Sequence, residues 1–433
     1  MSLLTSLSSG SNGLQSASSE LSVIGDNLSN ANTVGYKGGR ADFGDALAQT
    51  MIGAQGQIGL GSNLQAVQTM VTQGSLTNTG VNTDLALQGT GYFEVQGTTA
   101  TGQQGTFLTR DGEFTVNNQG FLVNQNGLFV QGYAADATGK ITGNLGNLQV
   151  GNASSQPLPT TTITVKGNLQ ANSTVIAAPF DPTNSATYNF STSATAYDSL
   201  GVSHGVQLYF AQTAAGTPAT WAWYAETDGG GITGGTAGTP VRIANGNLTF
   251  NNQGQLATMT TAAVNFNPKG AAQNQALTFN LGDPTANPGG TGLAGLTQFA
   301  DTSASTFVGQ DGYASGQLTS IQIDTTGTIQ GVFSNGQTRA IGQVGVATVA
   351  APDQLARDGE NLYAVTNASG SAVIGAAGTG GRGSITAGAL EQSNVDISDQ
   401  FVQMISAQRF FEANSKTVIT ADQLLSELIA MKR

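Results

Sequence analysis

The amino-acid sequence predicts a mainly β protein with an α-helix at each end. Two patterns carry this prediction. Apolar residues recur every seven positions at both ends, and the middle alternates in side-chain character between turn-forming pairs such as Asn-Gly and Asp-Gly. The composition agrees, because 60 of the 433 residues are glycine and only 9% are charged, which favours turns and short strands. A chain of this length is expected to form two or three domains.

The N-terminal helix is predicted from two interleaved apolar series. The first series is Leu7, Leu14, Leu21 and Leu28, and the second, three positions later, is Ala17, Ile24 and Ala31. This pattern is an a/d heptad stripe, which a single helix cannot bury by itself. Gly10 and Gly13 lower the intrinsic helicity of the segment.

The C-terminal helix shows the same spacing. Its two series are Met404, Phe411, Val418 and Leu425, followed by Ala407, Asn414, Ala421 and Leu428. Asp396, Ser398 and Asp399 are suitable N-terminal caps, and Lys432 and Arg433 suit the C-terminal end of the helix dipole. Two interpretations remain open: the helices form an intramolecular hairpin, or the helix pair packs against copies in other chains.

The middle of the chain is expected to be β structure. Short strands are predicted over 112–116, 121–123 and 128–130, and the phrase NNQG at 117–120 and 251–254 indicates a repeated hairpin. Breaks in composition near 154–162 and 282–305 mark an inserted domain. The predicted organisation is a terminal helical domain from 1–34 and 394–433, a connector over 35–75, a discontinuous inner β domain from 76–160 and 303–393, and an inserted outer β domain over 161–302.

Charge and hydropathy exclude several functions. The formal net charge is -12 with only 14 Lys and Arg residues, so no basic patch for nucleic acid or for an anionic membrane is predicted. The sequence contains no run of about 18 apolar residues, so we expect no membrane span. The N-terminus has no Lys or Arg before Lys37 and no continuous apolar core, so we do not expect a cleavable secretory signal.

Sequence patterns that would indicate catalysis or cofactor binding are weak. The chain has no Cys and one His, His204, which follows Asp198 and Ser199 closely. A catalytic triad usually joins distant segments, so a turn followed by a strand is the better interpretation. Residues 378–383 match GxGxxG by letter but lack a following helix pattern, so a loop is expected. No enzyme, metal site or cofactor is predicted, although sequence alone leaves a glycan hydrolase with a carboxylate pair open.

Two long segments resemble a known family. Residues 21–37 read LSVIGDNLSNANTVGYK and residues 389–431 read ALEQSNVDISDQFVQMISAQRFFEANSKTVITADQLLSELIAM. They are similar to the N- and C-terminal signatures of bacterial flagellar rod and hook proteins, and residues 109–133 resemble the β domain of that family. The similarity covers most of the chain and is loosest over about 163–300.

The resemblance implies a layered fold and a structural role. The terminal helices would pair in a coiled-coil-like inner layer, outside which lie the inner and inserted β domains. The implied function is a subunit that polymerises into a curved, flexible tube transmitting motor torque from rod to filament. The alternatives are a distal rod or other axial subunit and, further away, a secreted β-rich adhesin.

The resemblance also implies partners and a location. Expected partners are further copies of the chain in a helical tube, the distal rod protein, the hook cap protein, the hook–filament junction protein and the flagellar type III export apparatus. Export without a cleaved signal would place the protein outside the cell.

The predicted assembly residues follow from the stripes and the signatures. In the N-terminal helix they are Leu7, Leu14, Leu21, Ile24 and Leu28, and in the C-terminal helix Met404, Phe411, Val418, Leu425 and Leu428. A connector turn that joins helix to β domain is predicted at Asn27, Asn30, Asn32, Gly35 and Tyr36.

Overall fold

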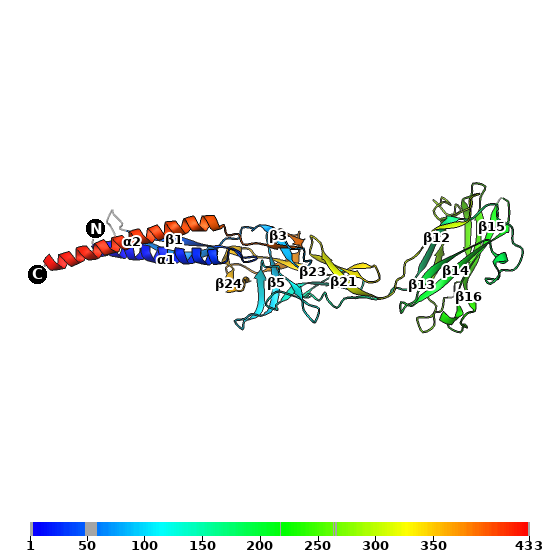
Figure 1. Ribbon diagram of the computed structural model, residues 1–433, viewed down its shortest axis with the longest axis horizontal. Coiled ribbons are helices and arrows are strands. Elements are labelled where there is room, and N and C mark those ends of the chain that lie inside the picture. The colour runs from blue at the N-terminus through cyan, green and yellow to red at the C-terminus, as the bar shows by residue number, and fades with distance from the viewer. Residues whose placement is uncertain (1–2, 48–58, 217, 263, 265, 432–433) are drawn as a thin grey trace. The chain divides into compact units, whose positions relative to one another are not determined.

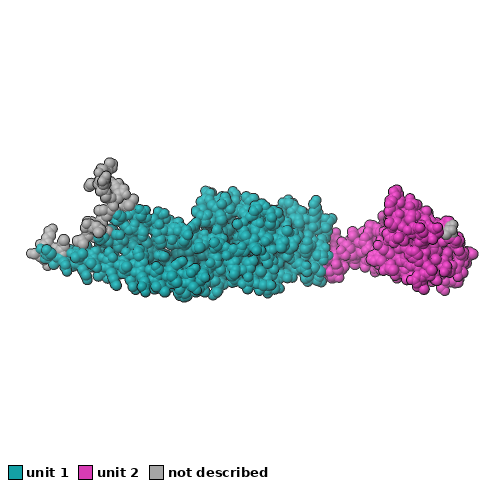
Figure 2. Space-filling model, turned by 90° about the horizontal axis from the view of Figure 1, so that it is seen from above, with its two compact units in different colours: residues 1–153, 318–332, 338–433 teal, residues 154–317, 333–337 magenta. Residues whose placement is uncertain are grey.

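A computed structural model describes residues 3–47, 59–216, 218–262, 264 and 266–431. The chain divides into two compact units, shown in teal and magenta in Figure 2. Unit 1 comprises 1–153, 318–332 and 338–433, and unit 2 comprises 154–317 and 333–337. The fold is mostly β with one long helix near each terminus, as the sequence predicts.

Both long helices belong to unit 1. Helix α1 spans Leu3–Ser29 and α2 spans Ile397–Met431, and they lie side by side (Figure 1). The Asp396 carboxylate caps α2 as expected, since its Oδ1 accepts the backbone N–H of Ser398 at 2.7 Å. Lys432 and Arg433 lie outside the described residues. Neither described helix combines the length and apolarity that crossing a membrane requires.

A two-stranded ribbon covers one side of α1. Strands β1 (Gly39–Leu47) and β2 (Gly59–Thr69) pair antiparallel. Side chains of the helix fix the ribbon, because Asn12 donates to the Leu60 carbonyl at 2.8 Å and Ser16 to the Ser62 carbonyl at 2.9 Å.

The body of unit 1 is built around one irregular sheet. Strands β21, β22, β23, β9, β5, β6, β25 and β24 follow one another across it, and two small antiparallel pairs, β3 with β28 and β4 with β27, bring the two halves of the sequence together. The strands are β3 (Leu76–Asn78), β4 (Leu85–Gln88), β5 (Tyr92–Thr98), β6 (Gln104–Thr109), β7 (Thr115–Val116), β8 (Leu122–Val123), β9 (Phe129–Ala135), β10 (Ile141–Asn147), β21 (Gly316–Ile323), β22 (Thr328–Phe333), β23 (Thr338–Thr348), β24 (Ala356–Gly359), β25 (Leu362–Ala364), β26 (Val373–Ala376), β27 (Ser384–Ala387) and β28 (Ala389–Glu391).

Unit 2 is formed by two sheets around one core. An antiparallel sheet orders its strands β13-β14-β15-β16-β17, and a second sheet has β12 at its centre. Trp221, Trp223 and Phe210 from the first sheet and Val165 and Phe279 from the second are all buried in that core. The strands are β11 (Ser154–Ser155), β12 (Thr162–Asn168), β13 (Phe190–Tyr197), β14 (Ser203–Ala214), β15 (Ala219–Asp228), β16 (Pro240–Phe250), β17 (Leu256–Thr261), β18 (Thr278–Asn280), β19 (Leu296–Thr297) and β20 (Ala304–Gln310).

The repeated NNQG phrase forms the same hairpin turn in both units, as predicted. It joins β7 to β8 and β16 to β17. In each turn the first Asn uses its Oδ1 to accept the backbone N–H groups two and four residues later: Asn117 at 3.0 and 2.9 Å, Asn251 at 2.9 and 3.0 Å. The fourth residue is a glycine with positive φ, +83° at Gly120 and +73° at Gly254.

The predicted strand over 112–116 is shorter in the structure. Only Thr115–Val116 pairs as a strand. Before it, Asp111 Oδ1 accepts the Glu113 N–H at 3.0 Å in a local turn, and the Gly112 carbonyl accepts the Leu85 N–H at 3.0 Å. The backbone hydrogen bonds of Gly112 and Glu113 are therefore made outside the hairpin.

Candidate functional site: the helix pair and its buried joint

The facing sides of α1 and α2 carry small residues. Ala17 on α1 and Ala407 and Ala421 on α2 are buried at 0%, 2% and 4% exposure. A methyl group added at Gly10 would lie 2.8 Å from Val418 Cγ2, and one at Gly13 would lie 2.6 Å from Asn414 Oδ1. The glycines that lower the helicity of the segment thus let the two backbones approach closely.

The predicted stripe residues divide into buried and half-buried sets. Ile24 is buried, and the side chains of Leu7, Leu14, Leu21 and Leu28 are half-buried. On α2, Met404, Val418 and Leu425 are half-buried and Phe411 is 40% exposed. The side chain of Leu428 is outside what the structure describes. The helices therefore satisfy the stripes only in part within one chain.

Sequence reasoning missed a second set of apolar residues on α2. Each lies next to a residue of the seven-residue series, and all are exposed: Ile405 53%, Phe410 46%, Ile419 53% and Leu424 47%. Phe401 and Val402 add to them at 48% and 68%. The signal was present in the sequence as apolar doublets at 404–405, 410–411, 418–419 and 424–425. These doublets widen the stripe beyond what one partner helix covers.

The predicted connector residues lie where α1 ends. Asn27 is buried, and its amide makes two bonds to Gly39, accepting from the N–H at 2.7 Å and donating to the carbonyl at 2.8 Å. It also donates to Gln400 Oε1 of α2 at 3.0 Å. Gly35 has φ +68°, and a Cβ there would meet the Asp111 backbone nitrogen at 2.5 Å. Asn30 bonds locally to Thr33 and Asp26, and Asn32 is exposed.

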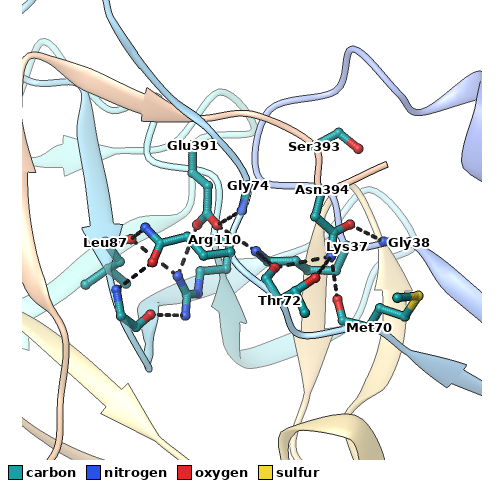
Figure 3. Close-up of polar contacts among 12 residues, drawn as sticks. Lys37, Gly38, Met70, Thr72, Gly74, Leu87, Arg110, Glu391, Ser393 and Asn394 are labelled. Carbon is teal, nitrogen blue, oxygen red and sulfur yellow. Dashed lines mark hydrogen bonds and ion pairs between the residues drawn. The ribbon is translucent and has the colours of Figure 1, made fainter. Parts of the chain in front are cut away.

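A buried ion cluster lies next to this turn (Figure 3). The Glu391 carboxylate is fully buried and accepts from Lys37 Nζ at 2.6 Å and from Arg110 Nη1 at 3.0 Å. It also accepts the Gly74 N–H at 2.9 Å. Lys37 and Arg110 are 1% and 5% exposed at their side chains. Burial lowers the pKa of Lys37 below its ordinary value of 10.5, and the Glu391 charge opposes that shift.

Further bonds tie the same segments together. Lys37 Nζ donates to the Thr72 carbonyl at 2.8 Å, and Arg110 Nη2 donates to the Gly89 carbonyl at 2.7 Å. Asn394 accepts the Gly38 N–H and donates to the Met70 carbonyl, both at 2.8 Å. The cluster thus joins four stretches of chain at 37–38, 70–74, 87–110 and 391–394. We call this set of residues the joint.

A second arginine supports the joint from β24. Arg357 Nη2 donates to the Lys37 carbonyl at 2.6 Å, and its Nη1 donates to Tyr36 Oη at 3.3 Å. Burial raises the pKa of Tyr36, and the hydrogen bond from Arg357 opposes the shift. In sequence, Arg110 and Arg357 each begin an Arg-Asp-Gly triplet that indicates only a turn. Their role in the joint depends on long-range pairing that the sequence does not display.

The residues considered for chemistry have structural roles. His204 Nε2 lies 3.1 Å from Asp198 Oδ2, but Ser199 Oγ accepts the Ala272 N–H, so the three groups do not form a relay. Asp198 Oδ1 accepts the N–H groups of Leu200 and Val202, each at 2.9 Å, in the turn before β14. Residues 378–383 form the loop that joins β26 to β27. Among the described residues, no group of three or more His, Asp or Glu could hold a metal ion.

Comparisons with known families match four stretches of the chain. The flagella basal body rod protein family matches residues 7–37, and the flagellar hook protein FlgE/F/G D1 domain matches 86–175. The flagellar basal body protein FlaE D2 domain matches 168–313, and the flagellar basal body rod FlgEFG protein C-terminal family matches 386–431. The first of these stretches covers most of α1, and the last contains α2.

Full-length relatives share one description. The chain is 34% identical to the flagellar hook protein FlgE of Treponema pallidum, with 100% of both chains covered. It is 33% identical to the protein of that description in Escherichia coli, covering 97% of this chain and 98% of the relative. Among solved structures, the Helicobacter pylori flagellar hook protein FlgE2 matches 71% of this chain and 98% of its own, with a TM-score of 0.47 and 16% identity.

Proposed function

The chain belongs to the flagellar hook protein family, whose members are structural subunits of the flagellum, and from that premise we propose that copies of it polymerise through their terminal helices into the hook. The observation that supports this most directly is the wide apolar surface on α2. Ile405, Phe410, Ile419 and Leu424 stay exposed after α1 has packed.

Burial of that surface would contribute to the free energy of assembly. Complete burial of one large apolar side chain contributes roughly 1.5–3 kcal/mol, and these four residues are about half exposed. Their gain of about 3–6 kcal/mol would offset part of the loss of translational and rotational freedom on association, which is about 4–15 kcal/mol for each subunit added. The proposed contacts include the half-buried stripe residues of both helices. Neighbouring subunits would therefore bury the apolar surface that stays exposed in one chain.

The low charge of the chain favours the same conclusion. Charged residues are 9% of the total, so few charged side chains must lose their water when neighbouring copies come into contact. The proposed tube would lie outside the cell and contact the distal rod protein, the hook cap protein and the hook–filament junction protein after passage through the flagellar type III export apparatus. A distal rod subunit is the alternative, and the match to hook proteins over the whole length disfavours it.

Electron microscopy of basal bodies from a strain that lacks this gene tests the proposal. We expect particles that end at a complete rod with no curved segment beyond it, and restoration of that segment by the gene supplied in trans. Truncated rods would assign the chain to the rod, and intact curved segments would overturn the proposal.

A further inference from the structure

The sequence contains four Asn-Gly pairs, and the structure treats one of them differently from the rest. The pairs lie at 12–13, 126–127, 245–246 and 335–336. Asn126 and Gly127 are both exposed in the turn that joins β8 to β9, whereas the asparagines of the other three pairs are half-buried. Glycine has no Cβ beside its backbone nitrogen, so that nitrogen can approach the preceding side chain more closely than in any other pair.

The other three asparagines are held by the fold. Asn12 lies within α1, and its amide donates to a carbonyl of β2 at 2.8 Å. Asn245 lies in β16, which is hydrogen-bonded to a strand on each side. The Asn335 amide donates to Ser155 Oγ at 3.1 Å and to the Ala314 carbonyl at 2.9 Å. Each of these side chains can move only if helix, sheet or strand-pair contacts open first.

The turn at Asn126 is held by weaker means. The Asn126 amide donates to the exposed carboxylate of Glu360 at 2.9 Å, and the Gly127 N–H donates to the Asn124 carbonyl at 3.0 Å. A Cβ added at Gly127 would meet only open space. Exposed turns of this kind open locally at a small fraction of the free energy of global unfolding.

The partner of Asn126 lies in a strained turn. Glu360 and Asn361 form the two-residue connection between β24 and β25, with φ +54° and +58°. Such a turn favours glycine or asparagine, and a glutamate there is uncommon. The Asn361 amide donates to the Val34 carbonyl at 2.9 Å. Side-chain bonds at both turn residues therefore help to hold this conformation, and one of them depends on Asn126.

We propose that Asn126 is a site of spontaneous deamidation, and that the carboxylate it gains loosens the turn at 360–361. The Gly127 nitrogen gives its proton to solvent and attacks Asn126 Cγ, the bond from Cγ to Nδ2 breaks, and the nitrogen leaves as ammonia. Water then opens the succinimide ring at either carbonyl and yields aspartate or isoaspartate. Either product places a negative charge beside Glu360 in place of a hydrogen-bond donor, and like charges repel.

Peptide mapping by mass spectrometry, with fragmentation that separates aspartate from isoaspartate, tests the site on the full chain kept in mildly alkaline buffer. We expect the product at Asn126 to form about tenfold or more faster than at the other three pairs, because their protecting contacts cost more free energy to open. In concentrated urea the four pairs should react at similar rates. A native chain in which another pair reacts as fast as Asn126 would overturn the assignment.

Hydrogen exchange of the full chain tests the consequence through Asn126→Asp, which carries one of the two products. Exchange of the peptide 356–364 should become several-fold faster, and a second change, Glu360→Gln, should reverse the effect by removing the like charge. Asn144→Asp, at an exposed position elsewhere in unit 1, should leave this exchange unchanged. Native exchange in Asn126→Asp, or faster exchange that Glu360→Gln does not reverse, would overturn the proposed loosening.

Discussion

At the scale of single residues, Glu391 has the largest structural consequence in unit 1. Its carboxylate compensates two buried cations, Lys37 and Arg110, and its own backbone carbonyl accepts the Gly35 N–H at 2.7 Å. A buried ion pair of this kind adds little net stability against an apolar replacement, but removing one partner leaves uncompensated charge. We therefore expect the joint to contribute more to fixing the helix pair in one position on the β body than to net stability.

Glu391→Gln should destabilise unit 1 by about 3–5 kcal/mol, because Lys37 and Arg110 then remain buried without a counter-charge. Asp42→Asn is the matched control, since its ion pair with Arg40 is exposed and worth about 0–1 kcal/mol. Urea unfolding followed by circular dichroism at the helix band reports unit 1. Both tryptophans of the chain are in unit 2. The urea midpoint that their fluorescence reports should therefore stay the same. A loss no larger than the control's would contradict the role of the joint.

Glu94 makes unit 1 sensitive to pH. Burial on β5 raises its pKa from 4.5 to about 7, so the folded state holds this proton more tightly than the unfolded state. Its contribution to stability is therefore full below pH 4.5 and is lost as the pH rises to about 7. Asp111, whose pKa burial raises to about 6, adds a slope of the same sign.

Glu94→Gln should remove the Glu94 part of that slope and stabilise unit 1 by up to about 3 kcal/mol at about pH 8. Urea midpoints measured across the pH range give the difference between variant and native chain, in which the Asp111 contribution cancels. Glu427→Gln, at an exposed position on α2, should leave the profile unchanged. Parallel profiles for native chain and Glu94 variant would show that this carboxyl does not control the pH dependence.

At the scale of elements, sequence predicted the helices well and their surfaces incompletely. The seven-residue series located α1 and α2 because packing of one helix on another selects that spacing. It did not show that Gly10 and Gly13 face α2, since glycine lowers helix propensity whether or not a neighbour lies close. It also missed Ile405 and Ile419, because a seven-residue series describes only the narrow stripe that one partner helix covers.

In the turns, a short sequence pattern applies more widely than the NNQG phrase. Among the described residues, six turns combine two features: the side-chain oxygen of an Asn or Asp accepts the backbone N–H four residues later, and the residue three positions later is a glycine with positive φ. They start at Asn117, Asn124, Asp136, Asp198, Asn251 and Asp324. From sequence, the NNQG copies were recognised as a repeat and a turn was expected at Asp198, but the rule that these turns share was not. The shorter phrase Asn/Asp-x-x-Gly predicts all six, because its geometry is satisfied within five residues.

Ile419→Asp should abolish polymerisation and leave the monomer folded. The residue is 53% exposed, so the charge costs little in the free chain but would have to lose its water between subunits. Thr420→Asp is the matched control, because it adds the same charge one residue later, about 100° further round the helix. Sedimentation and negative-stain microscopy measure assembly, and circular dichroism measures folding. Tubes formed by Ile419→Asp would contradict the role of this surface.

At the scale of the whole molecule, the chain enters and leaves unit 2 at one place. Ser154 and Ser155 on β11 pair antiparallel with Gln317 and Gly316 on β21. Asn335 donates to Ser155 Oγ at 3.1 Å and to the Ala314 carbonyl at 2.9 Å. The composition breaks near 154–162 and 282–305 predict an inserted domain, but strand pairing between residues far apart in sequence could not be read from them.

Replacement of 156–315 by Asn-Gly should therefore give a chain that folds and forms tubes without curvature. Ser155 and Gly316 are opposite each other, and a two-residue Asn-Gly turn closes an antiparallel pair at that spacing. We propose that polar, glycine-rich contacts of residues 163–300 between subunits exchange with water at a small net cost in free energy as the tube bends. Without these residues the tube should therefore stay straight. Electron microscopy of assembled tubes measures curvature against the full chain. Tubes as curved as the native ones would place curvature elsewhere.

The long reach of the joint has a consequence for the order in which the protein folds. Lys37 and Glu391 are 354 positions apart, and contacts of such separation form late because the intervening chain must be ordered first. Unit 2, whose main sheet comes from one continuous stretch, can complete itself before the C-terminal residues are in place. The joint closes only when the segment at 391–394 is in place, so Lys37 gains its counter-charge only after nearly the entire polypeptide has been made.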